Sequence, residues 1–198
     1  MASHPEHFYT PEEYLQLERK AAYKSEYYTG EIFAMSGASR AHNIIVINVA
    51  TALNTQLANR ECEIYASDMR VRTPDTTMYT YPDVVVVCGQ PQFEDAEVDT
   101  LLNPTLIIEV LSPSTEPHDR TTTCADYRKI ESLKEYILIA QRECRVTQYI
   151  KQPDGMWLFQ EAGSLDEMVH LPSVNCDLAL ESAYRKVELP SSQEEKLP

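Results

Sequence analysis

The stretch TLIIEVLSPS at residues 105–114 has the pattern of a buried β-strand with one carboxylate, Glu109, in its middle. A second apolar stretch, YPDVVVV at residues 81–87, carries Asp83 near its start. A buried carboxylate is costly unless a cation or hydrogen bonds compensate it, so sequences seldom place acids in such strands. Two such acids in two consecutive strands indicate a functional site rather than a plain hydrophobic core.

If the two strands are neighbours, a suitable register brings Asp83 and Glu109 together. Two close carboxylates in apolar surroundings repel each other, so the pKa of one rises unless a cation neutralises the pair. Mg²⁺ accepts such carboxylates and keeps several waters, and a metal-bound water is a nucleophile suited to phosphodiester hydrolysis. A plainer alternative stays open, in which Glu109 pairs with an arginine or caps the next helix and Asp83 only turns the chain after Pro82.

The length and composition favour one folded domain and argue against a membrane or secreted protein. The chain has 198 residues, 43% of them hydrophobic, which is enough for one full core. No apolar run approaches the roughly 20 residues of a membrane span. The N-terminal stretch holds neither a basic leader nor an apolar segment, so we find no secretion signal and expect a cytoplasmic protein.

Charge and cysteine content bear on the partners. The formal net charge of −14 opposes tight non-specific binding to nucleic acid, because such binding depends on Lys and Arg neutralising phosphates. The same charge suits a protein that gathers divalent cations. The five cysteines are scattered and never spaced C-x-x-C, which argues against a zinc cluster and a disulfide framework. We therefore expect reduced core thiols.

Helical patterns stand near the front of the chain. Thr10 as N-cap and Pro11 at the first helical position predict a helix start. The segment SRAHNIIVINVATALNTQLAN at residues 39–59 has apolar residues at helical spacing and predicts a long amphipathic helix. Its expected apolar stripe comprises Ile44, Ile47, Ala50, Leu53 and Leu57.

Strand patterns dominate the rest of the chain. A further helix is expected from about Asp119. Hairpins and strands are predicted at residues 24–37, 62–73, 81–89, 105–114, 135–140, 145–152 and 156–162. This order predicts one α/β domain over residues 1–189 with a mixed sheet, followed by a flexible C-terminal tail at residues 190–198.

Several blocks of the chain carry a resemblance to a known family. They are EYYTGEIFAMSGASRAHNIIVINV (26–49), YASDMRVR (65–72), YPDVVVV (81–87), NPTLIIEVLSPSTEPHDR (103–120) and YRKIESLKEYILI (127–139). In this order and spacing they resemble the Uma-type restriction endonucleases, a bacterial family of the PD-(D/E)XK nuclease superfamily, over roughly residues 8–160. The resemblance implies an α/β (α+β) fold with a restriction-endonuclease-like core. Such a core has a mixed central β-sheet flanked by helices, here with β-hairpins toward both ends.

The resemblance also implies roles for individual residues. Asp83 would be the acid of the PD element and Glu109 the acid of the (D/E)X element. Glu26 would add a further carboxylate to a site for Mg²⁺ or Mn²⁺. His42 and Asp68 lie in matching blocks, which makes them accessory candidates. The implied activity is that of a metal-dependent endonuclease hydrolysing phosphodiester bonds in nucleic acid, with DNA as the favoured substrate.

The chain departs from the family pattern at the catalytic lysine. The superfamily motif places a lysine two residues after the second acid, where this chain has Leu111. The family supplies a lysine from the following helix instead, and there the stretch DRTTTCADYR places Thr123. Lys129 is the remaining catalytic candidate, although the helical period turns it toward another side. Arginine cannot take over proton transfer because its pKa is too high.

Other functions stay open because of this departure and the acidic charge. One is a catalytically decayed nuclease fold that serves as a binding or assembly module. Another is a structural oligomer in which Glu109 pairs with an arginine across subunits. His118 and Asp119 could contact a metal, but a histidine at a predicted helix start is more often solvated or capping. We expect no membrane partner, regard a homodimer as open, and find no attached DNA-reading module that would support site-specific cleavage.

Overall fold

The computed structural model describes residues 7–75, 78–112 and 116–189. The first helix, α1 (Pro11–Glu18), begins where the sequence predicts it. The Thr10 hydroxyl accepts the Glu13 backbone N–H at 3.2 Å, and the Glu13 carboxylate accepts the Thr10 backbone N–H at 2.8 Å. This reciprocal capping box satisfies two donors that the helix itself leaves unpaired.

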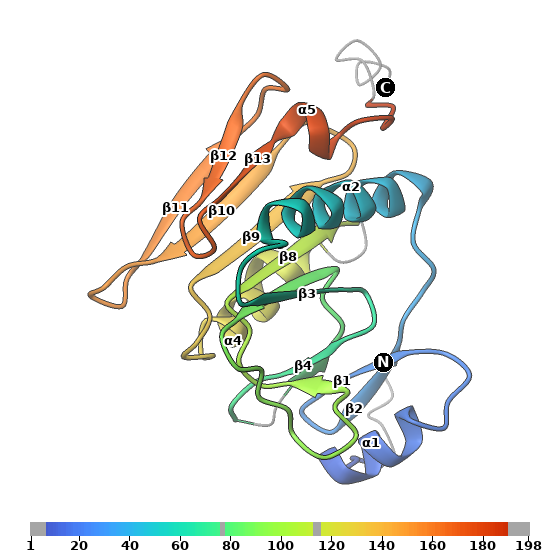
Figure 1. Cartoon of the computed structure of the whole chain (residues 1–198). Helices are drawn as coiled ribbons and strands as arrows, with labels where there is room; N and C mark the ends of the chain where they lie inside the picture. Colours follow the sequence, from blue (N-terminus) through green and yellow to red (C-terminus); the bar gives the residue numbers. More distant parts are fainter. Residues whose placement is uncertain (1–6, 76–77, 113–115, 190–198) are drawn as a thin grey trace.

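Two sheets carry most of the strands (Figure 1). The smaller has the order β2 (Glu31–Ala34), β1 (Ser25–Tyr28), β5 (Met78–Thr80), β4 (Arg70–Arg72) and β7 (Thr100–Leu101). The larger has the order β11 (Trp157–Ala162), β10 (Val146–Lys151), β9 (Glu135–Ala140), β8 (Leu106–Leu111), β6 (Val84–Cys88) and β3 (Cys62–Ala66). The larger sheet is mixed, because β8 pairs in parallel with β9 and antiparallel with β6.

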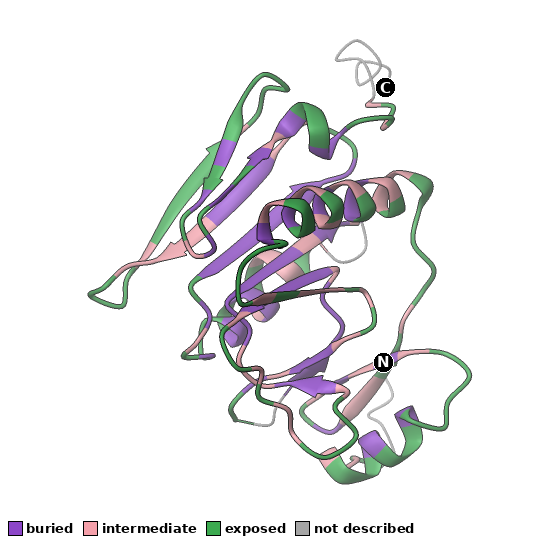
Figure 2. Cartoon of the chain, viewed as in Figure 1, coloured by how far each residue is buried: buried purple, intermediate pink, exposed green. Residues whose placement is uncertain are grey.

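The three central strands of the larger sheet, β6, β8 and β9, are buried on both faces (Figure 2). The four valines of β6 are fully buried, which confirms the prediction of a covered central strand. Glu109 is the one residue of β8 that retains partial exposure. Glu109, the one acid in this apolar strand, is therefore also the position at which the buried core opens to solvent.

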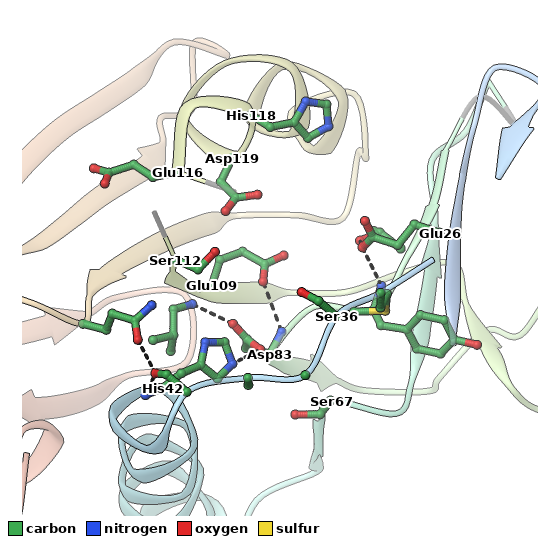
Figure 3. A pocket seen from close by; sticks show the side chains of 18 of the residues that line it. Glu26, Ser36, His42, Ser67, Asp83, Glu109, Ser112, Glu116, His118 and Asp119 are labelled. Carbon is green, nitrogen blue, oxygen red and sulfur yellow. Dashed lines mark hydrogen bonds and ion pairs between the residues drawn. The ribbon is translucent and has the colours of Figure 1, made fainter. Parts of the chain in front are cut away.

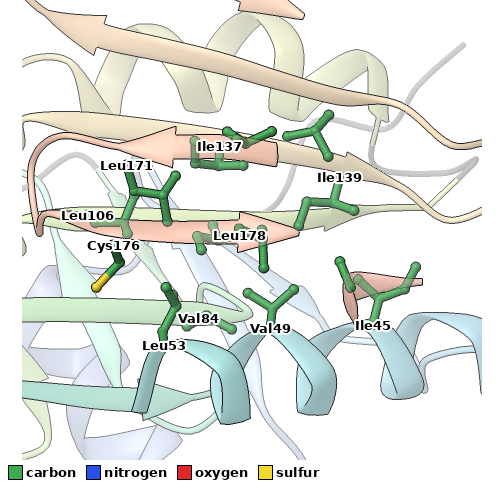
Figure 4. Close-up of a cluster of buried hydrophobic side chains, with 14 of the residues drawn as sticks. Ile45, Val49, Leu53, Val84, Leu106, Ile137, Ile139, Leu171, Cys176 and Leu178 are labelled. Atoms are coloured by element: carbon green, nitrogen blue, oxygen red, sulfur yellow. The ribbon is translucent and has the colours of Figure 1, made fainter. Parts of the chain in front are cut away.

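One face of the larger sheet is covered by α2 (Arg40–Leu57) together with α5 (Leu180–Ala183) and the hairpin of β12 (Met168–Leu171) and β13 (Cys176–Ala179). Figure 4 shows Ile45, Val49 and Leu53 of α2 pointing toward the sheet. These side chains join one hydrophobic cluster with the strands beneath them. The cluster fixes α2 against the sheet, and with it the N-terminal end of the helix.

The predicted helix is confirmed, but its buried stripe differs in part from the expected one. The buried residues of α2 are Ile45, Val46, Val49, Leu53 and Leu57. Ile47, which was expected to be inside, is 60% exposed. The run NIIVINV is apolar around much of the helix, so residue spacing alone permits more than one stripe. The contact with the sheet selects one of them, and the sequence does not reveal that contact.

The stretch predicted as one strand at residues 62–73 forms two strands, β3 and β4, which belong to different sheets. Between them Ser67 has φ 61°, a left-handed conformation that a continuous strand does not contain. The backbone N–H of Ser67 donates to the Asp83 carbonyl at 3.1 Å. The chain therefore changes sheet next to the start of β6.

Cys62 and Cys88 form a disulfide, so the prediction of reduced thiols is wrong for this pair. They are register partners in the antiparallel pair of β3 and β6. Their 26-residue separation hides this relation, because only the strand register places them opposite each other. Cys124, Cys144 and Cys176 are free thiols.

Three short helical segments connect β8 to β9: α3 (Glu116–His118), the π-helix η1 (Asp119–Thr123) and α4 (Cys124–Tyr127). Together with the sheets, they confirm the predicted mixed α/β fold, with flanking helices and hairpins toward both ends. Within the described ranges no helix has the length and apolar character needed to cross a membrane. Residues 190–198 lie outside the described residues, and the domain boundary, the homodimer and the cytoplasmic location stay predictions.

Candidate functional site

Asp83, just before β6, and Glu109, within β8, lie side by side (Figure 3). In the antiparallel register Val84 faces Ile108, so the acids stand one residue beyond this pair on each strand. The Asp83 backbone N–H donates to Glu109 Oε2 at 3.2 Å, and the Val110 N–H donates to Asp83 Oδ2 at 2.8 Å. Each carboxylate is thus held by the backbone of the other strand, and the expected proximity of the acids is confirmed.

His42, in the first turn of α2, contacts the same acid. Its Nε2 lies 2.8 Å from Asp83 Oδ1, and both side chains are largely buried. Burial lowers the pKa of His42, but the hydrogen bond and the charge of Asp83 outweigh that effect and raise the pKa above its ordinary value. His42 therefore favours its charged form, which neutralises part of the charge of Asp83.

Glu109 has an unfavourable environment for a carboxylate. Its pKa is raised well above the ordinary glutamate value, first by burial and then by the negative charges of Asp83 and Asp119. The Tyr127 hydroxyl donates to Glu109 Oε1 at 3.0 Å. This hydrogen bond and the one from the Asp83 backbone fix the carboxylate but do not remove the repulsion from the other acids.

Two further acids approach from other elements. Glu26, on β1 of the smaller sheet, accepts a hydrogen bond from the Thr80 hydroxyl, and its charge adds to the raised pKa of Glu109. Asp119, the first residue of η1, contributes more strongly to that pKa than Glu26 does. Sequence reasoning considered Asp119 as a metal contact but preferred a solvated or capping role, whereas the structure places it on the cavity wall. The DR pair at the end of a family-like block was the available signal.

These acids line a cavity of about 1740 Å³. Its wall includes the strand pair β1–β2, the N-terminal end of α2, β5, the residues just before β6, part of β8 and the segment around η1 (Figure 3). Small-molecule sites usually enclose about 300–1,000 Å³. The larger volume leaves room for part of a polymer beside the acid pair.

The other predicted residues lie elsewhere or do something else. Thr123 is buried and lines the cavity, at the place where the family resemblance implies a lysine. Lys129 is not part of the cavity wall, and its amine donates to Asp126 at 2.6 Å, because the helical turn points it away. Asp68 is 85% exposed and pairs with Lys24 at 2.8 Å. The structure therefore brings Glu26 and His42 to the acid pair but not Lys129 or Asp68.

No group of three or more His, Cys, Asp or Glu side chains in the described part of the chain stands close enough together to ligate a metal as it is. Asp83 is bound to His42, and Glu109 is bound to Tyr127. The donor chemistry nevertheless fits a hard divalent cation, because the converging groups are mostly carboxylate oxygens. A cation at this point would offset the repulsion between the carboxylates.

Sequence comparison gives the chain its relatives. Residues 11–182 match the Uma2 family, described as "Putative restriction endonuclease". The uncharacterized protein sll1609 of Synechocystis sp. (strain ATCC 27184 / PCC 6803 / Kazusa) is 41% identical over 152 residues, which cover 77% of this chain and 86% of the relative. The uncharacterized protein slr1290 of the same organism is 35% identical over 176 residues, covering 89% and 91%.

A solved structure supports the same relationship at the level of the fold. The crystal structure titled as a putative nuclease belonging to DUF820 from Anabaena variabilis ATCC 29413 has a TM-score of 0.72 to this chain. It is 20% identical, and the match covers 89% of this chain and 97% of that one. The family match covers most of the chain and the relatives are 35% and 41% identical, so the chain belongs to the Uma2 family.

Proposed function

We propose that this protein is a metal-dependent nuclease in which Asp83 and Glu109 bind Mg²⁺ or Mn²⁺ with help from Glu26 and Asp119. The observation that carries the proposal is the geometry of Asp83 and Glu109, whose carboxylates are held side by side on the wall of a cavity that Glu26 and Asp119 also line, an arrangement that raises the pKa of Glu109. Such an arrangement disfavours the charged metal-free state, and a bound divalent cation reverses that preference. An acid with a purely structural role gains no stability from neighbouring carboxylates.

The chain's own residues prepare this site. The Val110 N–H and His42 hold Asp83, and the Tyr127 hydroxyl holds Glu109, so both carboxylates are oriented before any ligand arrives. When bound, the metal would supply a water of lowered pKa and would offset the charge of a phosphodiester. Glu26 comes from the other sheet and would close the donor set from the opposite wall of the cavity.

Nucleic acid is the proposed substrate, with DNA as the first to test. The family description and the volume of the cavity support a polymeric phosphodiester. The net charge of −14 opposes this substrate unless cations inside the cavity compensate it. We therefore expect DNA binding to depend on the divalent metal.

Calorimetric titration of Mg²⁺ and Mn²⁺ tests the proposal. The wild-type protein should bind either ion saturably, and the Asp83→Asn/Glu109→Gln variant should bind neither. A matched control, Glu61→Gln/Glu97→Gln, removes the same charge from exposed positions and should bind as the wild type does. The wild-type protein and the control should then cleave plasmid and oligonucleotide DNA, and the Asp83→Asn/Glu109→Gln variant should not. Unchanged metal affinity in the Asp83→Asn/Glu109→Gln variant would exclude this site.

A second candidate function rests on Thr123. A buried hydroxyl stands on the cavity wall where the family resemblance implies a lysine, and Lys129 does not replace it there. The alternative is a catalytically decayed nuclease fold that binds nucleic acid without cutting it. Metal-dependent DNA binding with no cleavage, and cleavage gained in Thr123→Lys, would establish this alternative.

A further inference from the structure

Carboxylates outnumber cations on the wall of the cavity. The acids are Glu26, Asp83, Glu109, Glu116, Asp119, Glu143 and Glu188, and the bases other than histidine are Lys24, Arg40 and Arg142. A polyanion that enters such a cavity meets repulsion unless it finds local positive charge. Each cation that faces the cavity therefore matters for a phosphodiester substrate.

Lys24 is the single lysine among the described residues that line the cavity. It stands just before β1, two residues from Glu26, and the backbone N–H of Met35 donates to its carbonyl at 2.9 Å. This bond continues the pairing of β1 with β2, so strand alternation places Lys24 and Glu26 on the same side. A cation and one of the site acids thus come from the same short stretch.

The ammonium of Lys24 is held in place but keeps donor capacity. Its Nζ donates to the Ser67 carbonyl at 2.7 Å and to Asp68 Oδ1 at 2.8 Å, and it lies 5.3 Å from the centre of the Tyr81 ring. An ammonium has three N–H donors, and these two bonds leave one for a ligand. The pairing with Asp68 is weak compensation, because that carboxylate is 85% exposed to water.

The anchors of Lys24 adjoin the acid pair. Ser67, whose carbonyl binds the ammonium, also donates its N–H to the Asp83 carbonyl at 3.1 Å. Tyr81, beneath the ammonium, precedes Asp83 by two residues. The two cavity arginines lie apart from the acids: Arg40 is 66% exposed and faces Glu188 at 3.6 Å, and Arg142 is exposed. His42 contacts Asp83, but its ring is already engaged by that carboxylate.

We propose that Lys24 binds a phosphate of the nucleic-acid substrate beside Asp83 and so provides the cation that Thr123 cannot. This inference rests on the proposed nuclease site and adds its substrate contact. The remaining N–H of the ammonium forms a charge-assisted hydrogen bond to a phosphate oxygen. The lysine thus enters from the smaller sheet rather than from the helix after β8.

The test compares Lys24→Met with Lys134→Met, which removes the same charge from an exposed position outside the cavity. Affinity for a short fluorescein-labelled DNA oligonucleotide is measured with Ca²⁺ in place of Mg²⁺, at several salt concentrations, and cleavage is measured with Mg²⁺. Lys24→Met should weaken binding about tenfold or more and should lower the salt slope by about 0.7–0.9, the value of one phosphate contact. Lys134→Met should leave both unchanged.

Two further variants separate substrate binding from support of the fold. Thr123→Lys placed in Lys24→Met should restore affinity, since it returns a cation to the cavity from a helix that does not contact Ser67. Asp68→Asn keeps Lys24 and removes its ion pair, so DNA binding should be equal or tighter, whereas a lysine that only anchored the turn would make this variant weaker.

Equal binding by Lys24→Met and Lys134→Met, with metal affinity intact, would overturn the assignment of Lys24 and leave the nuclease proposal standing. Loss of folding in Lys24→Met with weaker binding in Asp68→Asn would also overturn it. A wild-type protein that binds no metal would instead contradict the nuclease site itself.

Discussion

Two buried glutamates stand on neighbouring parallel strands, Glu109 on β8 and Glu135 on β9, and burial is the largest cause of the raised pKa of each. Glu135 is fully buried, and its hydrogen-bond donors in the described part of the chain are neutral groups. The Gln148 amide donates to it at 2.6 Å, and the Ser173 N–H and hydroxyl donate at 3.1 and 2.5 Å. Glu109 has two donors, but Asp83 and Asp119 add repulsion.

The difference shows what separates a structural acid from a ligand-binding one. Burial alone raises the pKa of both residues and does not discriminate between them. Hydrogen bonds from Ser173 and Gln148 lower the pKa of Glu135 again, so its carboxylate is compensated within the fold. Glu109 instead keeps a repulsion from Asp83 and Asp119 beside its hydrogen bonds, and the proposed metal site depends on this difference.

The largest expected effect follows from Glu109→Gln. This change removes a negative metal ligand, so metal affinity and any cleavage should fall by more than about 100-fold. It also removes repulsion from Asp83, so the free energy of unfolding should be unchanged or higher. Calorimetry and urea unfolding measure the two quantities. A destabilised variant with normal metal binding would make Glu109 a structural acid like Glu135.

Glu135→Ala should give the opposite pattern. It leaves the buried donors of Gln148 and Ser173 unpaired, and the free energy of unfolding should drop by about 3 kcal/mol. Metal affinity should not change. Urea unfolding and metal titration of the same sample check both statements. Loss of metal binding in a folded Glu135→Ala protein would erase the distinction between the two acids.

The pH dependence of stability sharpens the comparison. The pKa of Glu109 is raised in the folded state, so its protonated form stabilises the fold. This contribution to the free energy of unfolding is fully present below the unfolded pKa of about 4.3. It is lost as pH rises through the folded pKa. The same sign holds for Glu135. Saturating Mg²⁺ should reverse the loss due to Glu109 only. Thermal unfolding at several pH values, in wild type and Glu109→Gln, measures this, and an equal Mg²⁺ effect in both proteins would contradict it.

The smallest expected effects come from the hydroxyl donors. Tyr127→Phe removes the hydrogen bond to Glu109 and should weaken metal binding by about threefold to tenfold, because the carboxylate loses one orienting contact. Ser173→Ala removes a donor to Glu135 and should lower the free energy of unfolding by about 1 kcal/mol without affecting metal binding. Metal titration and urea unfolding of both variants give the comparison. Weaker metal binding in Ser173→Ala would contradict the distinction between Glu109 and Glu135.

Much of the acid pair could be predicted from sequence because β-strands alternate with a period of two. That period gave each acid its face, and their proximity was predicted on the condition that the two strands are neighbours in a suitable register, which the structure confirms. The same regularity predicted the β1–β2 hairpin and the order of the later strands. These features depend on local pattern, and local pattern is what a single sequence displays.

Features that depend on packing between elements were not predictable in this way. Ile47 was placed inside because α2 is apolar around much of its surface, and only the sheet contact selects a side. Cys62 and Cys88 meet through a register that residue spacing does not give. Asp119 and Lys24 reach the cavity because η1 and the smaller sheet fold over the end of β8. Lys129 stays outside the cavity for a local reason that the helical period did indicate, because the helical turn points it away.

Strand β3 is fastened at both ends by bonds of different kinds. The disulfide joins Cys62 to Cys88 at one end, and the hydrogen bond of Ser67 to Asp83 closes the other, next to the acids. A reductant breaks the Cys62–Cys88 disulfide and leaves the hydrogen bond of Ser67 in place. In amide hydrogen exchange, reduction should therefore speed exchange at the Cys62 end of β3 and leave the protection near Ser67 in place. The border of the site and the outer corner of the sheet can thus loosen independently.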